Sequence, residues 1–312
     1  MKYFLLAILI SFKLLIFSQN DSITDVYLDK VILYGDLGYN SCPFDVKIKN
    51  LESFNFRNNI KPFIGLGLNY KLISIRLGTL LNYHLKGIED YSKTKILKLS
   101  SEISYKQFYT ELNYYRLSGY TLLKNNYEIS NNTKFDNLFF NKASLNFCVF
   151  TNKKFTYNLL KGIKRSIKKK SLSLYVKSIN AILDISNKES IIPRSYDLNF
   201  NLDYLHFTRL SAYEIGGLGG LALALKSKNN FQIGSMLGYG AVFIDRTIYS
   251  SEKKMNFRGL SPRYDFHFYI GYNVKKFFVM NFFDFEQRNI DFSEIEINSR
   301  LISYRLVAGY RF

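Results

Sequence analysis

The sequence has few prolines, few cysteines, no tryptophan and, past its first residues, no long apolar run. Only 4 of its 312 residues are proline. Because proline removes a backbone donor from a strand, this scarcity favours long, uninterrupted strands. After residue 19 no segment offers the roughly 18 apolar residues that a membrane-spanning helix needs. The composition therefore argues against a helical membrane protein and points to strands.

Two cysteines, Cys42 and Cys148, limit the possible disulfide chemistry. They could pair in an oxidising compartment. Cys148 is expected in a strand and Cys42 in a loop, which makes pairing the weaker alternative. The three histidines, His84, His206 and His267, lack the close spacing of metal ligands, so we expect no metal and no cofactor.

Residues 1–19 have the pattern of a secretory signal peptide. Lys2 supplies the positive start, an apolar stretch runs to Phe17, and Ser18 is a small residue near the expected cleavage point. Lys13 interrupts the stretch and keeps it shorter than a spanning helix. No cysteine follows, which argues against a lipoprotein anchor. We therefore expect an exported chain: a periplasmic protein, a secreted protein or a barrel in the outer membrane.

What the sequence does contain is aromatic residues and strict alternation. Phe occurs 28 times and Tyr 25 times, and hydrophobic residues make up 47% of a chain whose mean hydropathy is only −0.10. Apolar and polar residues are thus interleaved. The pattern is clearest at the end of the chain, where residues 299–312 place apolar side chains on one face of a strand and small or charged ones on the other. This strand, which ends in Phe312, looks like the last strand of a bacterial outer-membrane β-barrel.

The same alternation recurs along the chain from Phe63 onward. A very short turn around Lys71 and a long polar loop at 125–137 alternate in the way that outer-membrane barrels show. The strand-like segments are 63–70, 73–84, 95–105, 108–117, 139–149, 155–160, 172–185, 197–207, 213–225, 231–248, 263–275 and 277–288.

These segments predict an all-β fold, an antiparallel transmembrane β-barrel of about twelve strands (range ten to fourteen). The barrel is expected over 62–312, with both chain ends in the periplasm. Residues 20–61 form either an amino-terminal extension or the first strand with its loop. The alternative is a secreted soluble β-sheet protein, whose strands also alternate. Aromatic residues toward the strand ends favour the membrane, because such residues collect at its two interfaces.

A resemblance to a known family comes from several short segments. These are Phe155-Thr156-Tyr157 followed by the basic segment 164–171, the segment 62–71 (PFIGLGLNYK) and the terminal 309–312 (GYRF). With them the chain resembles an uncharacterised family of Bacteroidota proteins, domain of unknown function 4421. Ile167 stands where that family more often has a polar residue. The resemblance implies an outer-membrane-barrel-like fold and no established activity.

A basic run follows residue 160, in a chain whose formal charge is +18. It could contact the phosphates of lipid A, or an anionic ligand if its side chains point into the barrel, because clustered cations bind phosphate. The alternative is that the run is a solvated loop. Binding of nucleic acid is the least favoured hypothesis. The candidate polyanion-binding residues are Lys161, Lys164, Arg165, Lys168, Lys169 and Lys170.

Charged residues on the inward face of the strands form the second candidate site. Opposite charges packed across a small barrel would fill it rather than open a pore. Among them, His267 and Asp265 share a face, and Ser303 could lie across the sheet, which would suit a rim-sited lipid hydrolase. The expected lumen network comprises Arg76, Glu111, Arg263, Asp265, Asp284, Glu286, Arg288 and Arg305.

The function that these observations favour is non-enzymatic: a structural, ligand-binding or narrow-pore barrel in the outer membrane. The alternative is a lipid hydrolase or deacylase that uses His267, Asp265 and Ser303. The expected partners are outer-membrane lipids, including lipopolysaccharide, and the barrel-assembly machinery through the strand that ends in Phe312. No nucleic-acid partner is expected.

Overall fold

The computed structural model of the 312-residue chain describes most of its residues. No described helix is long and apolar enough to cross a membrane. The signal-peptide prediction for 1–19 lies outside the described part of the chain. The described residues are 24–48, 53–81, 92–123, 133–167, 170–192, 207–250, 254–291 and 295–312.

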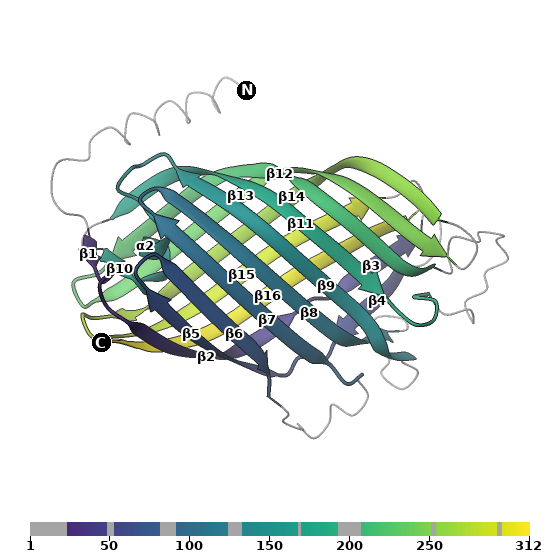
Figure 1. The fold of residues 1–312 in the computed structure, drawn as a ribbon, viewed down its shortest axis with the longest axis horizontal. Helices are drawn as coiled ribbons and strands as arrows, with labels where there is room; N and C mark the ends of the chain where they lie inside the picture. The colour runs from purple at the N-terminus through teal and green to yellow at the C-terminus, as the bar shows by residue number, and fades with distance from the viewer. Residues whose placement is uncertain are drawn as a thin grey trace.

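Twelve antiparallel strands close into a barrel (Figure 1). The first wall strand pairs with the last, and each of the others pairs with its neighbours in chain order, so the sheet has no free edge there. The predicted fold class and strand number are confirmed. The wall strands are β2 (Ile32–Ser41), β5 (Pro62–Tyr70), β6 (Ile73–Leu80), β7 (Lys95–Tyr105), β8 (Phe108–Leu123), β9 (Thr133–Phe150), β11 (Ser171–Ser186), β12 (Phe207–Lys226), β13 (Phe231–Ser250), β14 (Lys254–Asn273), β15 (Phe277–Asp291) and β16 (Ile295–Arg311).

The two ends of the barrel differ in their connections. Tight turns join β5 to β6 and β7 to β8 at the end that carries the carboxy terminus, which we call the terminal end (Figure 1). Lys71 and Lys106 adopt positive φ values of 48° and 49° in these turns. The short turn expected at Lys71 is therefore present. The opposite end, which we call the distal end, carries the long connections from β6 to β7, from β8 to β9 and from β11 to β12, whereas the terminal end has one long connection, from β9 to β11.

The barrel wall is narrower at its distal end. Strands β6 and β7 stop at Leu80 and Lys95, well short of their neighbours. Beyond them the hairpin of β3 (Phe44–Ile48) and β4 (Ser53–Asn58) completes the wall: β3 pairs with β16, and β4 pairs with β8. The ring thus loses β6 and β7 and narrows from twelve strands to ten. The described residues 32–48 and 53–58 belong to this wall.

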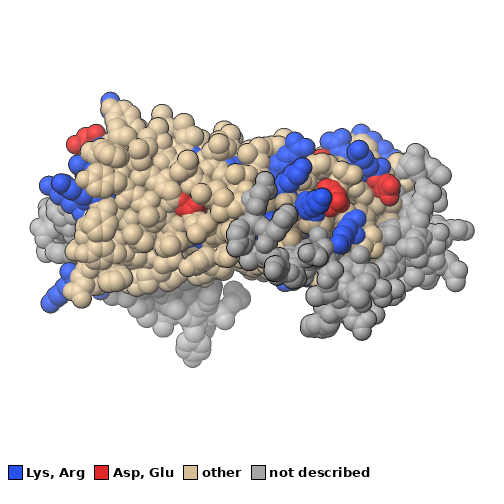
Figure 2. All heavy atoms as spheres, turned by 90° about the horizontal axis from the view of Figure 1, so that it is seen from below, with Lys and Arg blue, Asp and Glu red and all other residues tan. Residues whose placement is uncertain are grey.

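The polarity of the two faces of the wall reverses along the strands. The outer face changes from apolar to polar toward the distal end, and the inner face changes from polar to apolar. In β13 the outward side chains run from Phe231 to Phe243, largely apolar, and then become Asp245 and Thr247. Inward side chains change in the opposite sense: polar groups line the part nearer the terminal end, and apolar groups fill the rest. Figure 2 shows, on one face, a surface with almost no charged side chains between the two ends of the barrel, and a cluster of charged side chains at the distal end.

We name the two regions by this exchange. The apolar belt is the uncharged outer surface nearer the terminal end, and it includes the exposed Leu66, Val176, Leu237 and Leu306. The distal zone is the part with a polar exterior and an apolar interior. It comprises β3, β4 and 117–123, 133–140, 183–186, 207–212, 244–250, 254–259, 287–291 and 295–300.

The described part of the connection between β9 and β11 folds inward and closes the terminal end; we call residues 151–167 and 170 the plug. It holds α2 (Tyr157–Lys161), all of whose residues are buried, and β10 (Arg165–Ile167), which pairs with β1 (Thr24–Val26). The predicted strand at 155–160 is therefore wrong. Gly162 ends the helix in the left-handed conformation at φ 68°, which glycine adopts without strain.

Gly234 of β13 lets the helix approach the wall. A Cβ at that position would lie 2.5 Å from the carbonyl oxygen of Leu160 and 2.9 Å from its Cα. Such distances are far inside van der Waals contact, so a larger residue at 234 would displace α2. The predicted strand at 197–207 lies mostly outside the described residues.

Candidate functional site

The interior of the barrel holds a network of buried ion pairs. One group centres on Glu214 of β12 and Glu286 of β15. Arg263 lies 2.6 Å from Glu214, and Arg288 lies 3.0 Å from Glu286 and 3.9 Å from Glu214. Lys142, from the opposite wall strand β9, reaches Glu286 at 2.7 Å. Burial of these charges is tolerated because each has an oppositely charged partner.

A second group centres on His267 of β14. Its Nδ1 lies 2.8 Å from Asp284, and its Nε2 lies 3.7 Å from Asp265. Lys177 approaches Asp265 at 2.6 Å, and Arg305 approaches Asp284 at 2.9 Å. These contacts join β11, β14, β15 and β16 across the lumen. Lys177 with Asp265, and Lys142 with Glu286 in the first group, act as cross-braces between strands that do not neighbour one another.

Arg76 and Asp36 form a third, bidentate pair. Arg76 Nε and Nη2 donate to the two oxygens of Asp36 at 2.7 and 2.6 Å, and both side chains are almost fully buried. Paired, parallel hydrogen bonds of this kind are the strong form of the arginine–carboxylate contact. Nearby, Glu111 accepts a hydrogen bond from Asn146 at 3.4 Å.

The alternation of inward and outward positions along the strands, taken from the sequence alone, identified part of this network. All eight lumen residues expected from the sequence point into the barrel. Their partners were missed, although each occupies an inward position on its strand. Asp36 was missed because the sequence left 20–61 open between two interpretations. The missed partners are Asp36, Lys142, Lys177 and Glu214.

Two of the proposed hydrolase residues, His267 and Ser303, line one cavity, but with Asp265 they do not form a triad. Both ring nitrogens of His267 face carboxylates, and the described contacts include no hydrogen bond between His267 and Ser303. Ser303 Oγ is buried and has no hydrogen-bond partner among the described residues. A serine nucleophile needs a base within hydrogen-bond reach, and the imidazole here has no free nitrogen for it. His84 and His206 lie outside the described residues.

The basic run forms the second half of the plug, at the terminal end of the barrel. Lys161 reaches Glu102 of β7 at 2.5 Å, and Lys164 Nζ donates to the carbonyl oxygen of Ile73 at 2.8 Å. Arg165 lies in β10, and Lys170 is exposed. Lys168 and Lys169 lie outside the described residues. The run is thus divided between cations that hold the plug to the wall and at least one that faces solvent.

Lys164 of the plug has a pKa that its surroundings shift. Burial lowers its pKa to about 8, from an ordinary 10.5, and the nearby ammonium of Lys161 adds to the decrease. Glu102 opposes it but does not offset the burial. The charged form of Lys164 is therefore held at a cost, which the hydrogen bond to Ile73 only partly offsets.

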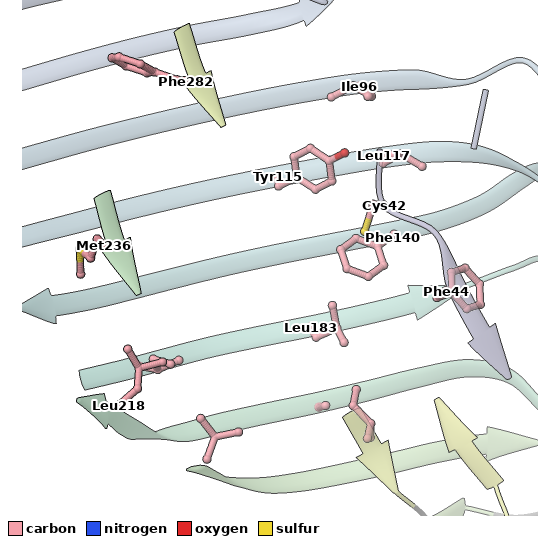
Figure 3. Close-up of a cluster of buried hydrophobic side chains, with 14 of the residues drawn as sticks. Cys42, Phe44, Ile96, Tyr115, Leu117, Phe140, Leu183, Leu218, Met236 and Phe282 are labelled. Atoms are coloured by element: carbon pink, nitrogen blue, oxygen red, sulfur yellow. The ribbon is translucent and has the colours of Figure 1, made fainter. Parts of the chain in front are cut away.

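Apolar side chains fill the distal zone. Phe44 of β3 stacks on Phe56 of β4 with ring centroids 4.6 Å apart, and Tyr120 meets Phe44 edge-on at 5.1 Å. Figure 3 shows Cys42, Phe140 and Phe44 directed into the same interior space. Cys42 and Cys148 are both free and buried. The lumen is therefore closed at the distal end by this core and at the terminal end by the plug.

Between the two closures lies a cavity of about 70 Å³. A water needs roughly 10–15 Å³ of such space, so the cavity has room for several waters or one small solute. Its wall includes members of the ion-pair network, side chains of the plug and Lys98 of β7. The charged residues that line it are Arg76, Lys98, Glu102, Glu111, Lys142, Lys161, His267, Asp284, Glu286 and Arg305.

Comparison with solved structures returns outer-membrane barrels. The outer membrane protease OmpT of Escherichia coli is 10% identical, with a TM-score of 0.44, over 92% of this chain and 98% of that one. The translocator domain of the autotransporter NalP from Neisseria meningitidis is 9% identical, with a TM-score of 0.41, over 96% of this chain and 91% of that one. The toluene transporter TodX of P. putida is 8% identical, with a TM-score of 0.32, over 91% and 90%.

Sequence comparison assigns the chain to a family. No curated protein sequence matches it. Residues 31–312, the whole barrel from the first wall strand to the carboxy terminus, match the family model described as a domain of unknown function, DUF4421. The protein is therefore a member of the DUF4421 family.

Proposed function

We propose that this protein is an exported, non-enzymatic barrel of the outer membrane that does not conduct solutes. The observation that carries this proposal is the closure of one lumen at both ends, by the plug on one side and by the apolar core of the distal zone on the other. Between them the ion pairs brace the walls. A structural or ligand-binding role fits this arrangement better than an open or narrow pore.

The apolar belt supports the membrane location. Leu66, Leu237 and Leu306 are 70%, 59% and 42% exposed, and a monomeric soluble protein rarely leaves so continuous an apolar surface uncovered. Aromatic pairs mark both edges of the belt: Tyr239 with Tyr264 on the distal side, and Phe277 with Tyr310 on the terminal side. Such aromatic girdles are typical of the two interfaces of a transmembrane barrel.

The length of the strands supports a projection beyond the membrane. About 9–11 residues of a tilted strand cross a bilayer. Strands β12, β13 and β14 each have 20 residues. The residues of these strands beyond the roughly 9–11 that cross the bilayer lie in the distal zone, whose outward face is polar. With the chain ends in the periplasm, the distal zone stands on the outer side as a water-facing platform.

The partners that we propose are outer-membrane lipids. The outward cations at the base of the distal zone, among them Arg116, Arg209, Arg258 and Arg300, would meet the phosphates of lipopolysaccharide. The exported chain would engage the barrel-assembly machinery through β16. Its last residue, Phe312, is 63% exposed on the apolar face.

Planar-bilayer recording tests the proposal. The purified protein should insert from detergent and give no discrete conductance steps, because neither end of the lumen is open. Regular single-channel steps from the unaltered protein would overturn the non-conducting role. Recovery of the folded protein from the soluble fraction without detergent would overturn the membrane location.

The non-enzymatic role has a separate test. Pure protein should show no esterase or deacylase activity above that of the His267→Ala variant, because the His267 nitrogens are both held by carboxylates. A rate that the unaltered protein has and His267→Ala lacks would support the hydrolase in its place.

A further inference from the structure

The wall of the cavity between the plug and the distal core carries one cation that is not paired with a described carboxylate. Each carboxylate of the interior faces a cation: Glu102 faces Lys161, Asp284 faces Arg305, and Glu286 faces Lys142 and Arg288. Among the nearby charges, the ammonium groups of Lys177 and Lys161 attract the carboxylate of Glu111 most strongly. Lys98 remains over. It lines the cavity, and no described carboxylate lies within ion-pair distance of its ammonium.

The same cavity holds donors that are buried and unused. Arg76 Nη1 has no partner among the described residues, although Nε and Nη2 of the same guanidinium bind Asp36. Arg305 Nε and Ser303 Oγ are likewise unpartnered. All three side chains are more than nine-tenths buried and line the cavity. Buried donors without acceptors are rare in folded proteins, and a group of them at one cavity implies an acceptor that occupies it.

Charge identifies the kind of acceptor. Water could accept from each donor, but only an anion would also offset the repulsion that Arg305 and Arg76 exert on the ammonium of Lys98. A small oxyanion supplies both a negative charge and several acceptor oxygens. Guanidinium groups bind phosphate and carboxylate oxygens in preference to halide, because their planar donors match these groups. A volume of about 70 Å³ suits an ion of the size of phosphate or a short carboxylate.

We propose that the lumen binds a small oxyanion, phosphate or a short carboxylate, through Lys98, Arg76, Arg305 and Ser303. The anion would complete the network that ties β6, β7 and β16 together at the centre of the barrel. Arg76 and Arg305 keep their existing carboxylates and offer the anion their remaining N–H groups. The site goes beyond the proposed function and does not depend on it, since a conducting barrel could also hold the anion.

Each variant for the test changes one residue. Lys98→Met removes the unpaired charge but keeps the length of the side chain, and Ser303→Ala removes the hydroxyl donor. Lys254→Met is the matched control, because Lys254 is exposed at the distal end of β14, far from the cavity. Heat-modified gel migration establishes that each variant is folded. If Lys98→Met does not fold, Lys98→Gln replaces it.

Inorganic phosphate is the probe, added to the full-length protein in non-ionic detergent at constant ionic strength set with chloride. Phosphate should raise the unfolding temperature of the unaltered protein and of Lys254→Met. The apparent Kd should increase at least tenfold in Lys98→Met and severalfold in Ser303→Ala. Acetate and succinate, titrated in the same way, distinguish a carboxylate site from a phosphate site; either supports the proposal.

Two results would overturn it. One is an unfolding temperature that none of phosphate, acetate and succinate shifts beyond the chloride control, together with no phosphate released when the purified protein is denatured. The other is phosphate binding of equal strength in Lys98→Met and the unaltered protein. Both results leave the conductance test of the proposed function unaffected.

Discussion

Arg311, one residue from the end of the chain, donates a hydrogen bond of 2.7 Å to the carbonyl oxygen of Gly162, where the plug helix ends. The same guanidinium donates to Ile163 and Val274 and to the side chain of Asn273. The last wall strand therefore holds the plug in place, and the barrel and its closure at the terminal end are one structural unit.

Replacement of Arg311 by methionine should release the plug. It removes the donors from four buried acceptors, so we expect the free energy of unfolding to fall by about 3–5 kcal/mol. The plug should also become sensitive to protease in detergent-solubilised protein. Urea unfolding followed by tyrosine fluorescence measures the first effect, and limited proteolysis measures the second.

Lys30→Met is the control for this variant. Lys30 donates to the carbonyl oxygen of Phe312 at 3.4 Å on the exposed surface, where water can replace it. It should change stability by less than about 0.5 kcal/mol. Equal effects of the two variants would show that the plug does not depend on Arg311.

Gly234 should tolerate no side chain. A Cβ there would lie 2.5 Å from the carbonyl oxygen of Leu160, so Gly234→Ala must push α2 off the wall. We expect it to destabilise the plug by about 1–3 kcal/mol, the usual cost of overpacking. Gly219→Ala is a suitable comparison, since the added Cβ would lie 3.7 Å from the backbone carbonyl oxygen of Tyr175, which is ordinary van der Waals contact. Thermal unfolding of both variants distinguishes close packing from a general effect of glycine replacement.

The exchange of polarity along β16 predicts opposite outcomes for one kind of substitution. Leu306 lies in the apolar belt, and Asn298 lies on the same outward face in the distal zone. Leu306→Arg should cost about 2–4 kcal/mol of folding in lipid, whereas Asn298→Arg should cost almost nothing. Refolding into lipid vesicles, followed by gel mobility, measures both. Similar costs at the two positions would contradict the boundary drawn between belt and distal zone.

Lys164 gives the plug a pH dependence. Its folded pKa, about 8, lies below the ordinary 10.5, so between these values the unfolded chain holds a proton that the folded protein has released. Stability must then rise with pH across this window. The difference in unfolding free energy between the unaltered protein and Lys164→Met should shift by about 1–3 kcal/mol in favour of the unaltered protein from pH 8 to 10.5.

Other groups titrate in the same window, so the comparison between the two proteins carries the result. Tyrosines and exposed lysines contribute equally to both and cancel in the difference. Lys161 and Glu102, which face Lys164, are present in both as well. A difference that stays flat from pH 8 to 10.5 would show that Lys164 is not held in a buried, unfavourable state.

The sequence by itself determined the barrel, because alternation with a period of two is a local property. Inward and outward positions in 299–312 or 263–275 could be assigned from parity alone. For the same reason parity identified Arg263, Asp265 and Arg305 as lumen residues. The aromatic residues toward strand ends were the reason to favour a membrane barrel over a soluble sheet.

Only the tertiary structure decided what closes the barrel and which charges pair. Segment 155–160 alternates as a strand would, but the wall of twelve strands is complete without it, so it folds inward as α2 and carries Lys161 to Glu102. Pairs such as Lys142 with Glu286 join residues 144 positions apart, on strands that are not neighbours in the wall. Their contact depends on how the wall closes on itself, which is a property of the whole ring and not of any one strand.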